Sequence, residues 1–220
     1  RIGCSMSKPK NDTANARPKR KKTALIIAIV LLLIALVAAG VLVFRYWSQQ
    51  NAYQELETYV EVEEDPNVVK LSDLSADWDA LRKINPDIVG WIYIPDSKIN
   101  YPVVQTNNNS KYLNTLFDGT SNASGAIFLD SDDTAPGMVD QQTTIYGHHM
   151  NDGSMFNVIS DTTDQATFDS IEYVYYITRD ATYKLRPLAT KVVEDTYAKA
   201  RATNFEGDDG LTSYRSEMLD

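Results

Sequence analysis

The sequence predicts a mainly β domain, a closed or nearly closed β-barrel with short helical insertions, preceded by one transmembrane helix. An unbroken apolar run near the N-terminus, residues 24–44, predicts the helix. After residue 90, many short runs of β-branched and aromatic residues alternate with turn signals, which is typical of barrels. Hydrophobic residues make up 43% of the 220 residues and charged residues 23%, so wholesale disorder is excluded.

The apolar run has the length and the flanks of a membrane anchor. Ala24 to Phe44 contains no charged side chain, and at 1.5 Å per residue it gives a helix of roughly 31 Å. A cleaved signal peptide, the alternative, usually has a shorter apolar region of about 7–15 residues. Five basic residues lie between positions 17 and 22, whereas only Arg45 follows closely. The positive-inside rule therefore predicts a single-pass protein of the cell membrane with a cytoplasmic N-terminus and an extracytoplasmic domain.

Charged residues are distributed unevenly along the chain. The net charge is -9, but the first 22 residues carry eight Lys and Arg against one acid, and the remainder is strongly acidic. An acidic domain argues against nucleic-acid binding. We expect four parts: a basic cytoplasmic tail (1–22), a transmembrane signal anchor (23–47), an acidic stalk (48–75) and one globular domain (76–220).

Within the domain, the spacing of apolar residues changes from helical to alternating. Trp78, Leu81 and Ile84 predict a short helix with Asp77 as its N-cap. Residues 90–95 and 99–104 predict a β-hairpin. Further strands are expected at 126–129, 143–146, 172–178 and 183–193, and helical pieces at 110–116, 155–159, 165–168 and 211–219.

His148 and His149 are the two histidines of the chain, and they follow an apolar strand. Imidazole suits proton transfer near neutral pH. Neighbouring strand residues point to opposite faces, so at most one ring would face a given pocket, and a metal site shared by both is poor. The residues alone leave open whether such a histidine is structural or catalytic.

Other candidates for chemistry are weaker. Asp130, Asp132 and Asp133 offer oxygen ligands for calcium, but an acidic loop is more often simply solvated. Cys4 is the one cysteine of the sequence, which excludes an intrachain disulfide, and it lies in the basic tail. We therefore expect no metal and no cofactor, and we interpret Cys4 as inert.

A series of sequence blocks resembles one known family. The blocks are Ile-Asn-Pro-Asp-Ile-Val-Gly-Trp-Ile (84–92), Ile-Asn-Tyr-Pro-Val-Val-Gln (99–105), Lys-Tyr-Leu-Asn (111–114), Gly-Ala-Ile-Phe-Leu-Asp (125–130), Thr-Ile-Tyr-Gly-His-His-Met (144–150) and Asp-Gly-Ser-Met-Phe (152–156). In this order and spacing, over about residues 76–178, the chain resembles the class B sortases. These are membrane-anchored cysteine transpeptidases of Gram-positive bacteria with an eight-stranded barrel.

The resemblance implies a mechanism and a set of residues. A cysteine attacks a carbonyl in the sorting signal of a secreted protein, and an amine of a cell-wall precursor or a pilin resolves the thioacyl enzyme. His148 matches the catalytic histidine, which protonates the leaving amine, and His149 has no assigned role. Asn109, Leu113 and Tyr146 match positions that line the sorting-signal groove. The implied partners are the sorting-signal peptide, the wall or pilin amine and the membrane.

The chain also departs from the family pattern. The Thr-Leu-x-Thr-Cys strand and a later strand with an arginine are not among the 220 residues. Arg186, Arg201 and Arg215 precede that part of the family pattern and cannot be carried over as its arginine. We therefore expect a C-terminally incomplete class B sortase that lacks its last barrel strands and is inactive as it stands. The alternatives are a non-catalytic sortase-like peptide-binding module and a membrane-tethered scaffold.

Overall fold

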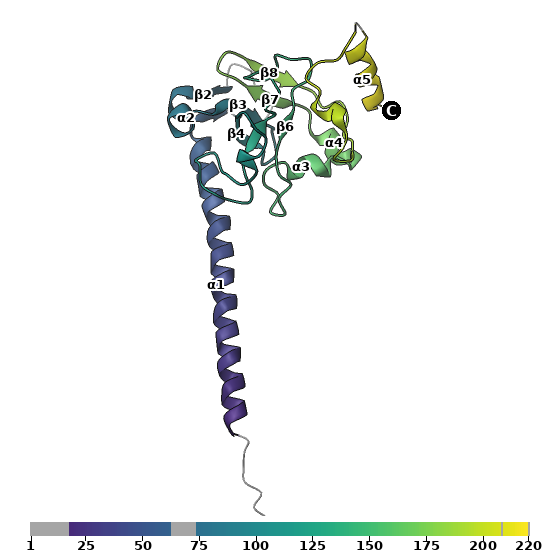
Figure 1. Ribbon diagram of the computed structural model, residues 1–220. Coiled ribbons are helices and arrows are strands. Elements are labelled where there is room, and N and C mark those ends of the chain that lie inside the picture. The colour runs from purple at the N-terminus through teal and green to yellow at the C-terminus, as the bar shows by residue number, and fades with distance from the viewer. Residues whose placement is uncertain (1–17, 63–73, 208, 220) are drawn as a thin grey trace, which may run out of the picture. The chain divides into compact units, whose positions relative to one another are not determined.

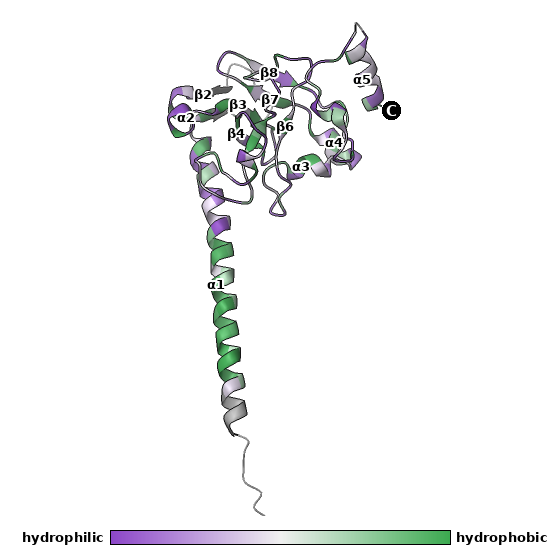
Figure 2. Ribbon diagram, in the orientation of Figure 1, coloured by the Kyte–Doolittle hydropathy of each residue, from purple (hydrophilic) through white to green (hydrophobic). Residues whose placement is uncertain are grey.

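The computed structural model describes residues 18–62, 74–207 and 209–219. It divides the chain into two compact units, Arg1–Tyr46 and Trp47–Asp220. Helix α1 (Pro18–Glu57) contains the predicted apolar run, visible as the long green band in Figure 2. All side chains from residue 23 to residue 47 are exposed, so this stretch is a candidate for a membrane span. The basic side chains of residues 19–22 lie outside the described residues.

The second unit is built on a six-stranded sheet in the order β6-β5-β4-β3-β7-β8 (Figure 1). The strands are β3 (Ile88–Tyr93), β4 (Asn100–Val104), β5 (Ile127–Leu129), β6 (Ile145–Tyr146), β7 (Val174–Ile177) and β8 (Thr182–Leu185). All neighbours are antiparallel except β4 and β5, which are parallel. A small sheet pairs β1 (Val60–Val62) with β2 (Leu74–Ala76).

Short helices fill the connections, and the sequence predicts each of them except η3. They are α2 (Trp78–Ile84), the 3₁₀ turn η2 (Lys111–Leu113), α3 (Asn157–Asp161), α4 (Gln165–Ser170), the 3₁₀ turn η3 (Ala198–Arg201) and α5 (Gly210–Leu219). The predicted N-cap of α2 is confirmed, because the Asp77 carboxylate accepts a hydrogen bond of 2.9 Å from the Ala80 amide. Leu81 of α2 is fully buried in the core of the sheet.

The predicted hairpin is the centre of the sheet. β3 and β4 pair with Tyr93 opposite Asn100, and Asp96 takes a positive φ of 57° in the turn. Trp91 is fully buried, and its indole N–H donates to the Asn100 side chain at 2.7 Å. Gly90 allows Tyr176 of β7 to lie against β3, because a Cβ there would come within 2.5 Å of the phenol oxygen. The hairpin therefore carries both the hydrogen bonds and the packing of the sheet centre.

One expected strand differs from the structure. The strand expected at 183–193 is wrong beyond Leu185, where β8 ends; Pro187 has no N–H to donate to a ladder. At the beginning of the expected stalk, α1 continues to Glu57. Tyr53 and Leu56, three residues apart on one helix face, are 6% and 4% exposed in the second unit. Residues 63–73 of that stalk lie outside the described residues.

Candidate functional site

His148 lies in the loop that leaves β6. Gly147 separates it from Tyr146, and a Cβ at this glycine would be 2.5 Å from Ile127 Cδ1 and 2.7 Å from the Phe156 ring. A side chain at 147 therefore does not fit between β5 and the segment that follows the histidines. This close approach fixes the path of the backbone just before His148.

The His148 ring has a defined partner. Its Nε2 atom is 2.8 Å from the carbonyl oxygen of Leu113, the last residue of η2. A carbonyl oxygen can only accept a hydrogen bond, so Nε2 carries the proton and donates it. His148 is half-buried, whereas His149 is exposed and pairs through its backbone with Met155. The two adjacent histidines therefore have different surroundings.

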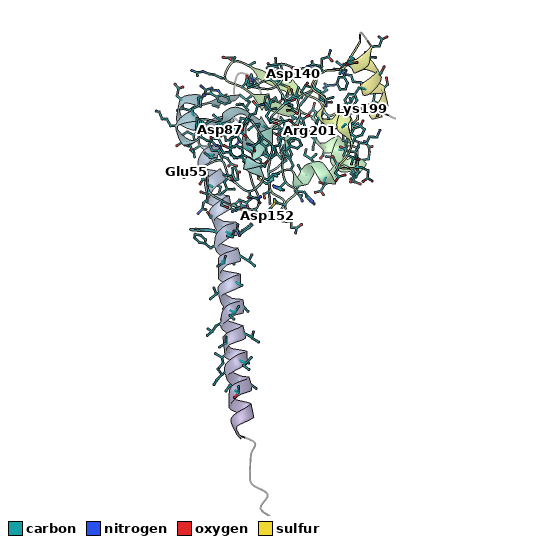
Figure 3. The ribbon with its side chains drawn as sticks, viewed as in Figure 1. Glu55, Asp87, Asp140, Asp152, Lys199 and Arg201 are labelled. Atoms are coloured by element: carbon teal, nitrogen blue, oxygen red, sulfur yellow. The ribbon has the colours of Figure 1, made fainter. Side chains whose placement is uncertain are left out.

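Asp130, directly after β5, is the centre of a polar network. The Tyr146 hydroxyl donates to Asp130 Oδ2 at 2.5 Å. Arg201 of η3, labelled in Figure 3, donates from Nε to Oδ2 at 2.7 Å and from its terminal nitrogen to Oδ1 at 3.0 Å. The Asp130 side chain is 1% exposed, and that of Arg201 is 49% exposed. A buried carboxylate is thus compensated by a bidentate guanidinium and a phenol.

The network fixes the protonation of its members. Burial alone raises the pKa of the Asp130 carboxyl, but the hydrogen bonds from Arg201 and Tyr146 outweigh it and hold that pKa well below its usual range. Burial and the hydrogen bond to the Asp130 carboxylate raise the pKa of Tyr146 to about 12. At neutral pH, Asp130 is therefore a carboxylate and Tyr146 a neutral donor.

The sequence-predicted residues gather around two neighbouring contacts. Leu113 holds the His148 ring through its backbone carbonyl. Asn109 Oδ1 accepts a hydrogen bond of 2.8 Å from the Ser131 amide, next to Asp130, to which Tyr146 donates. Since Tyr146 and His148 are separated only by Gly147, the two contacts belong to one region at the ends of β5 and β6.

Within the described residues, no group of three or more His, Cys, Asp or Glu could hold a metal ion. The carboxylates considered for calcium have protein partners instead: Arg201 also donates to Asp132 at 2.9 Å, and Asp133 accepts from the Thr144 amide at 2.7 Å. Sequence reasoning missed the pair of Asp130 and Arg201, which are 71 residues apart. The available signal was an acidic residue placed directly after a wholly apolar strand.

A surface hollow lies elsewhere, beside α2 and the β7–β8 turn. It is lined by Ala76, Trp78 and residues 177–182. The hydrogen bonds described above for the cluster around His148 involve none of these residues, so the candidate site rests on the chemistry of that cluster and not on the presence of a hollow.

Comparison with known proteins agrees with this architecture. The sortase domain family matches residues 92–212. Sortase B of Staphylococcus aureus is 28% identical over 213 residues, covering 90% of this chain and 81% of the relative. Sortase B of Listeria monocytogenes is 43% identical over 76 residues, which cover 34% of this chain and 30% of the relative.

Solved structures give the same result. Sortase B of Bacillus anthracis in complex with AAEK1 superposes with a TM-score of 0.63 at 30% identity, covering 80% of each chain. A Staphylococcus aureus sortase B–substrate complex gives 0.59 at 30% identity and covers 64% of this chain and 65% of that one, just under two thirds of its length. The sheet is thus a half-barrel of the sortase type. The chain belongs to the sortase family and, by these relatives, to its class B.

Proposed function

We propose that this chain carries the histidine and groove part of a class B sortase site. The enzyme would cleave a sorting signal on secreted proteins and join them to a cell-wall or pilin amine. The observation that carries the proposal is the ring of His148, held by the Leu113 carbonyl beside the Asn109–Asp130–Tyr146 region. Sequence blocks around these residues match relatives that are sortases.

In the proposed reaction, His148 moves the protons. A cysteine thiolate attacks the scissile carbonyl carbon, the C–N bond breaks, and the His148 imidazolium gives the proton on Nδ1 to the leaving amine, which leaves a neutral ring. The acceptor amine then attacks the thioester, the C–S bond breaks, and the imidazole takes up the proton that the amine loses. The hydrogen bond from Nε2 to Leu113 supports this role because it fixes the ring orientation and tautomer.

The groove residues have a different role in this proposal. Tyr146 and Asn109 are held at the end of β5, Tyr146 by the Asp130 carboxylate and Asn109 by the Ser131 amide, and Leu113 is exposed beside His148. Polar and apolar side chains fixed in this way suit an extended peptide. A relative was solved as a sortase B–substrate complex, which supports a peptide ligand here.

The alternative function differs in needing no thiol outside the membrane. The sequence contains a single cysteine, Cys4, which lies on the N-terminal side of the apolar helix, where the positive-inside rule predicts cytoplasm. Residues 1–220 therefore offer no extracytoplasmic thiol, and we propose that they form no thioacyl adduct by themselves. A membrane-tethered, non-catalytic peptide-binding module is the alternative.

Sequencing the reading frame beyond the codon for Asp220 separates the two functions. The enzyme requires a Thr-Leu-x-Thr-Cys block followed by an arginine, and a stop codon favours the binding module. In the enzyme case, the product of the locus, purified from membranes and mixed with sorting-signal peptides of the same genome, gains a thioacyl mass on that cysteine. An adduct on the 220-residue chain itself contradicts the proposal.

A further inference from the structure

The end of helix α1 is built into the domain. Gln49 is 4% exposed, and its side-chain amide donates to the Ser154 hydroxyl at 3.2 Å across 105 residues of sequence. One turn further on, the buried Tyr53 hydroxyl donates to the Gly125 carbonyl at 2.9 Å. A flexible spacer between an anchor and a domain needs neither a buried amide nor a buried phenol. Further contacts connect Ser154 and Gly125 to the surroundings of His148.

The first route reaches the His148 backbone. Ser154 is followed by Met155, whose amide donates to the Tyr101 hydroxyl at 3.1 Å, and the Tyr101 ring packs edge-on against Tyr53 at 5.1 Å. The next amide, that of Phe156, donates to the His148 carbonyl at 2.9 Å. The α1 end therefore supports the segment that holds the backbone of His148.

The second route reaches the His148 ring. Gly125, whose carbonyl accepts from Tyr53, lies against the carbonyl oxygens of Tyr112 and Leu113 so closely that a Cβ would clash with both. The Ala126 amide fixes this approach by donating to Tyr112 at 3.0 Å. The Leu113 carbonyl is the partner of His148 Nε2. Tyr53 thus holds Gly125, and the Leu113 carbonyl that accepts from the His148 ring packs against this glycine.

We infer that Gln49 and Tyr53, on the end of the anchor helix, are positioning residues for His148. The contacts from Gln49 fix the backbone of His148, and those from Tyr53 fix the Leu113 carbonyl. Together they determine where Nε2 points. The importance of this for catalysis rests on the proposed function, whereas the coupling itself does not. The helix end is then a part of the site and not a spacer.

Reactivity of the ring toward diethyl pyrocarbonate tests the coupling. The full chain is purified in detergent with His149→Gln, so that the modification rate belongs to His148, and a matched His148→Gln chain reports on His149. Each of these two chains then receives one further substitution. Tyr53→Phe removes the hydroxyl and keeps the ring, and Gln49→Met removes the amide and keeps the side-chain volume. Tyr46→Phe, at an exposed tyrosine of the same helix, is the control.

Weakening the hydrogen bond from Nε2 to the Leu113 carbonyl should make His148 roughly 2–10-fold faster to modify. We expect this rise in both variants, with His149 and the Tyr46→Phe control unchanged and the circular dichroism spectrum retained. An unchanged His148 rate, or an equal rise at both histidines, overturns the inference. Loss of activity in His148→Ala is a separate measurement, so failure of the coupling and failure of the proposed function can be distinguished.

Discussion

The side chain of Asp130 combines full burial with a formal charge, and four donor groups stabilise it: two of Arg201, the Tyr146 hydroxyl and the Asp132 amide. A buried carboxylate without partners would be strongly destabilising. Arg201 and Tyr146 together satisfy both oxygens, and Arg201 reaches from η3 across the end of β5. The same carboxylate orients Tyr146, a proposed groove residue. Asp130 therefore connects the stability of the domain to the geometry of the proposed site.

Asp130→Asn should lower the free energy of unfolding by about 1–3 kcal/mol, because charge-assisted hydrogen bonds to a buried group are lost. Asp132→Asn is the matched control. Its side chain is 68% exposed and shares the same arginine, so we expect a loss of less than about 1 kcal/mol. Urea denaturation of the full chain in detergent measures both, and equal losses would contradict the assignment.

The same variant has a predicted pH dependence. The pKa of Asp130 is lowered in the folded state, so its stabilisation is present above the unfolded value of about 3.9 and is lost as the pH falls through the lower folded value. The difference in stability between the wild type and Asp130→Asn should therefore shrink below about pH 4. A difference that stays constant down to pH 2 would argue against an ionised Asp130.

At the scale of single elements, the N-cap Asp77 determines where helix α2 begins. Asp77→Ala should cost about 1 kcal/mol, because the Ala80 amide loses its acceptor at the helix start. Asp79→Ala, two residues later, is the control. Its side chain is 78% exposed and lies 3.8 Å from Arg179, so we expect only a few tenths of a kcal/mol. Denaturation midpoints compare the two, and a larger loss at Asp79 would contradict the capping role.

Local patterns predicted the elements that depend on local chemistry. The hairpin of β3 and β4, the capped helix α2 and the apolar part of α1 are confirmed. The extension of the strand beyond Leu185 is wrong, because alternation alone does not say whether a neighbouring strand is present to pair with it. The contacts from Gln49 to Ser154 and from Asp130 to Arg201 join residues far apart in sequence, and no local pattern contains them. The grouping of Asn109, Leu113 and Tyr146 came from family resemblance.

For the whole molecule, the asymmetry of charge around the apolar helix predicts the topology. Five basic residues between positions 17 and 22 precede the apolar run 24–44, and the acidic domain follows it. Protease added to intact cells stripped of their wall should digest the domain and spare the N-terminal tail, as detected by tags at the two ends. Protection of the domain in such cells, with digestion after lysis, would reverse the predicted orientation.

The central claim is that His148 performs the proton transfers of a class B sortase, and substitution of each histidine tests it most directly. In the product of the locus, His148→Ala should lower the transpeptidation rate by about 10²–10⁴-fold, the usual cost of a lost general acid. His149→Ala should keep most of the activity, because His149 is exposed and takes no part in the proposed reaction. The measurement is the rate of joining a sorting-signal peptide to an amine acceptor. An inactive His149→Ala enzyme beside an active His148→Ala enzyme would contradict the account.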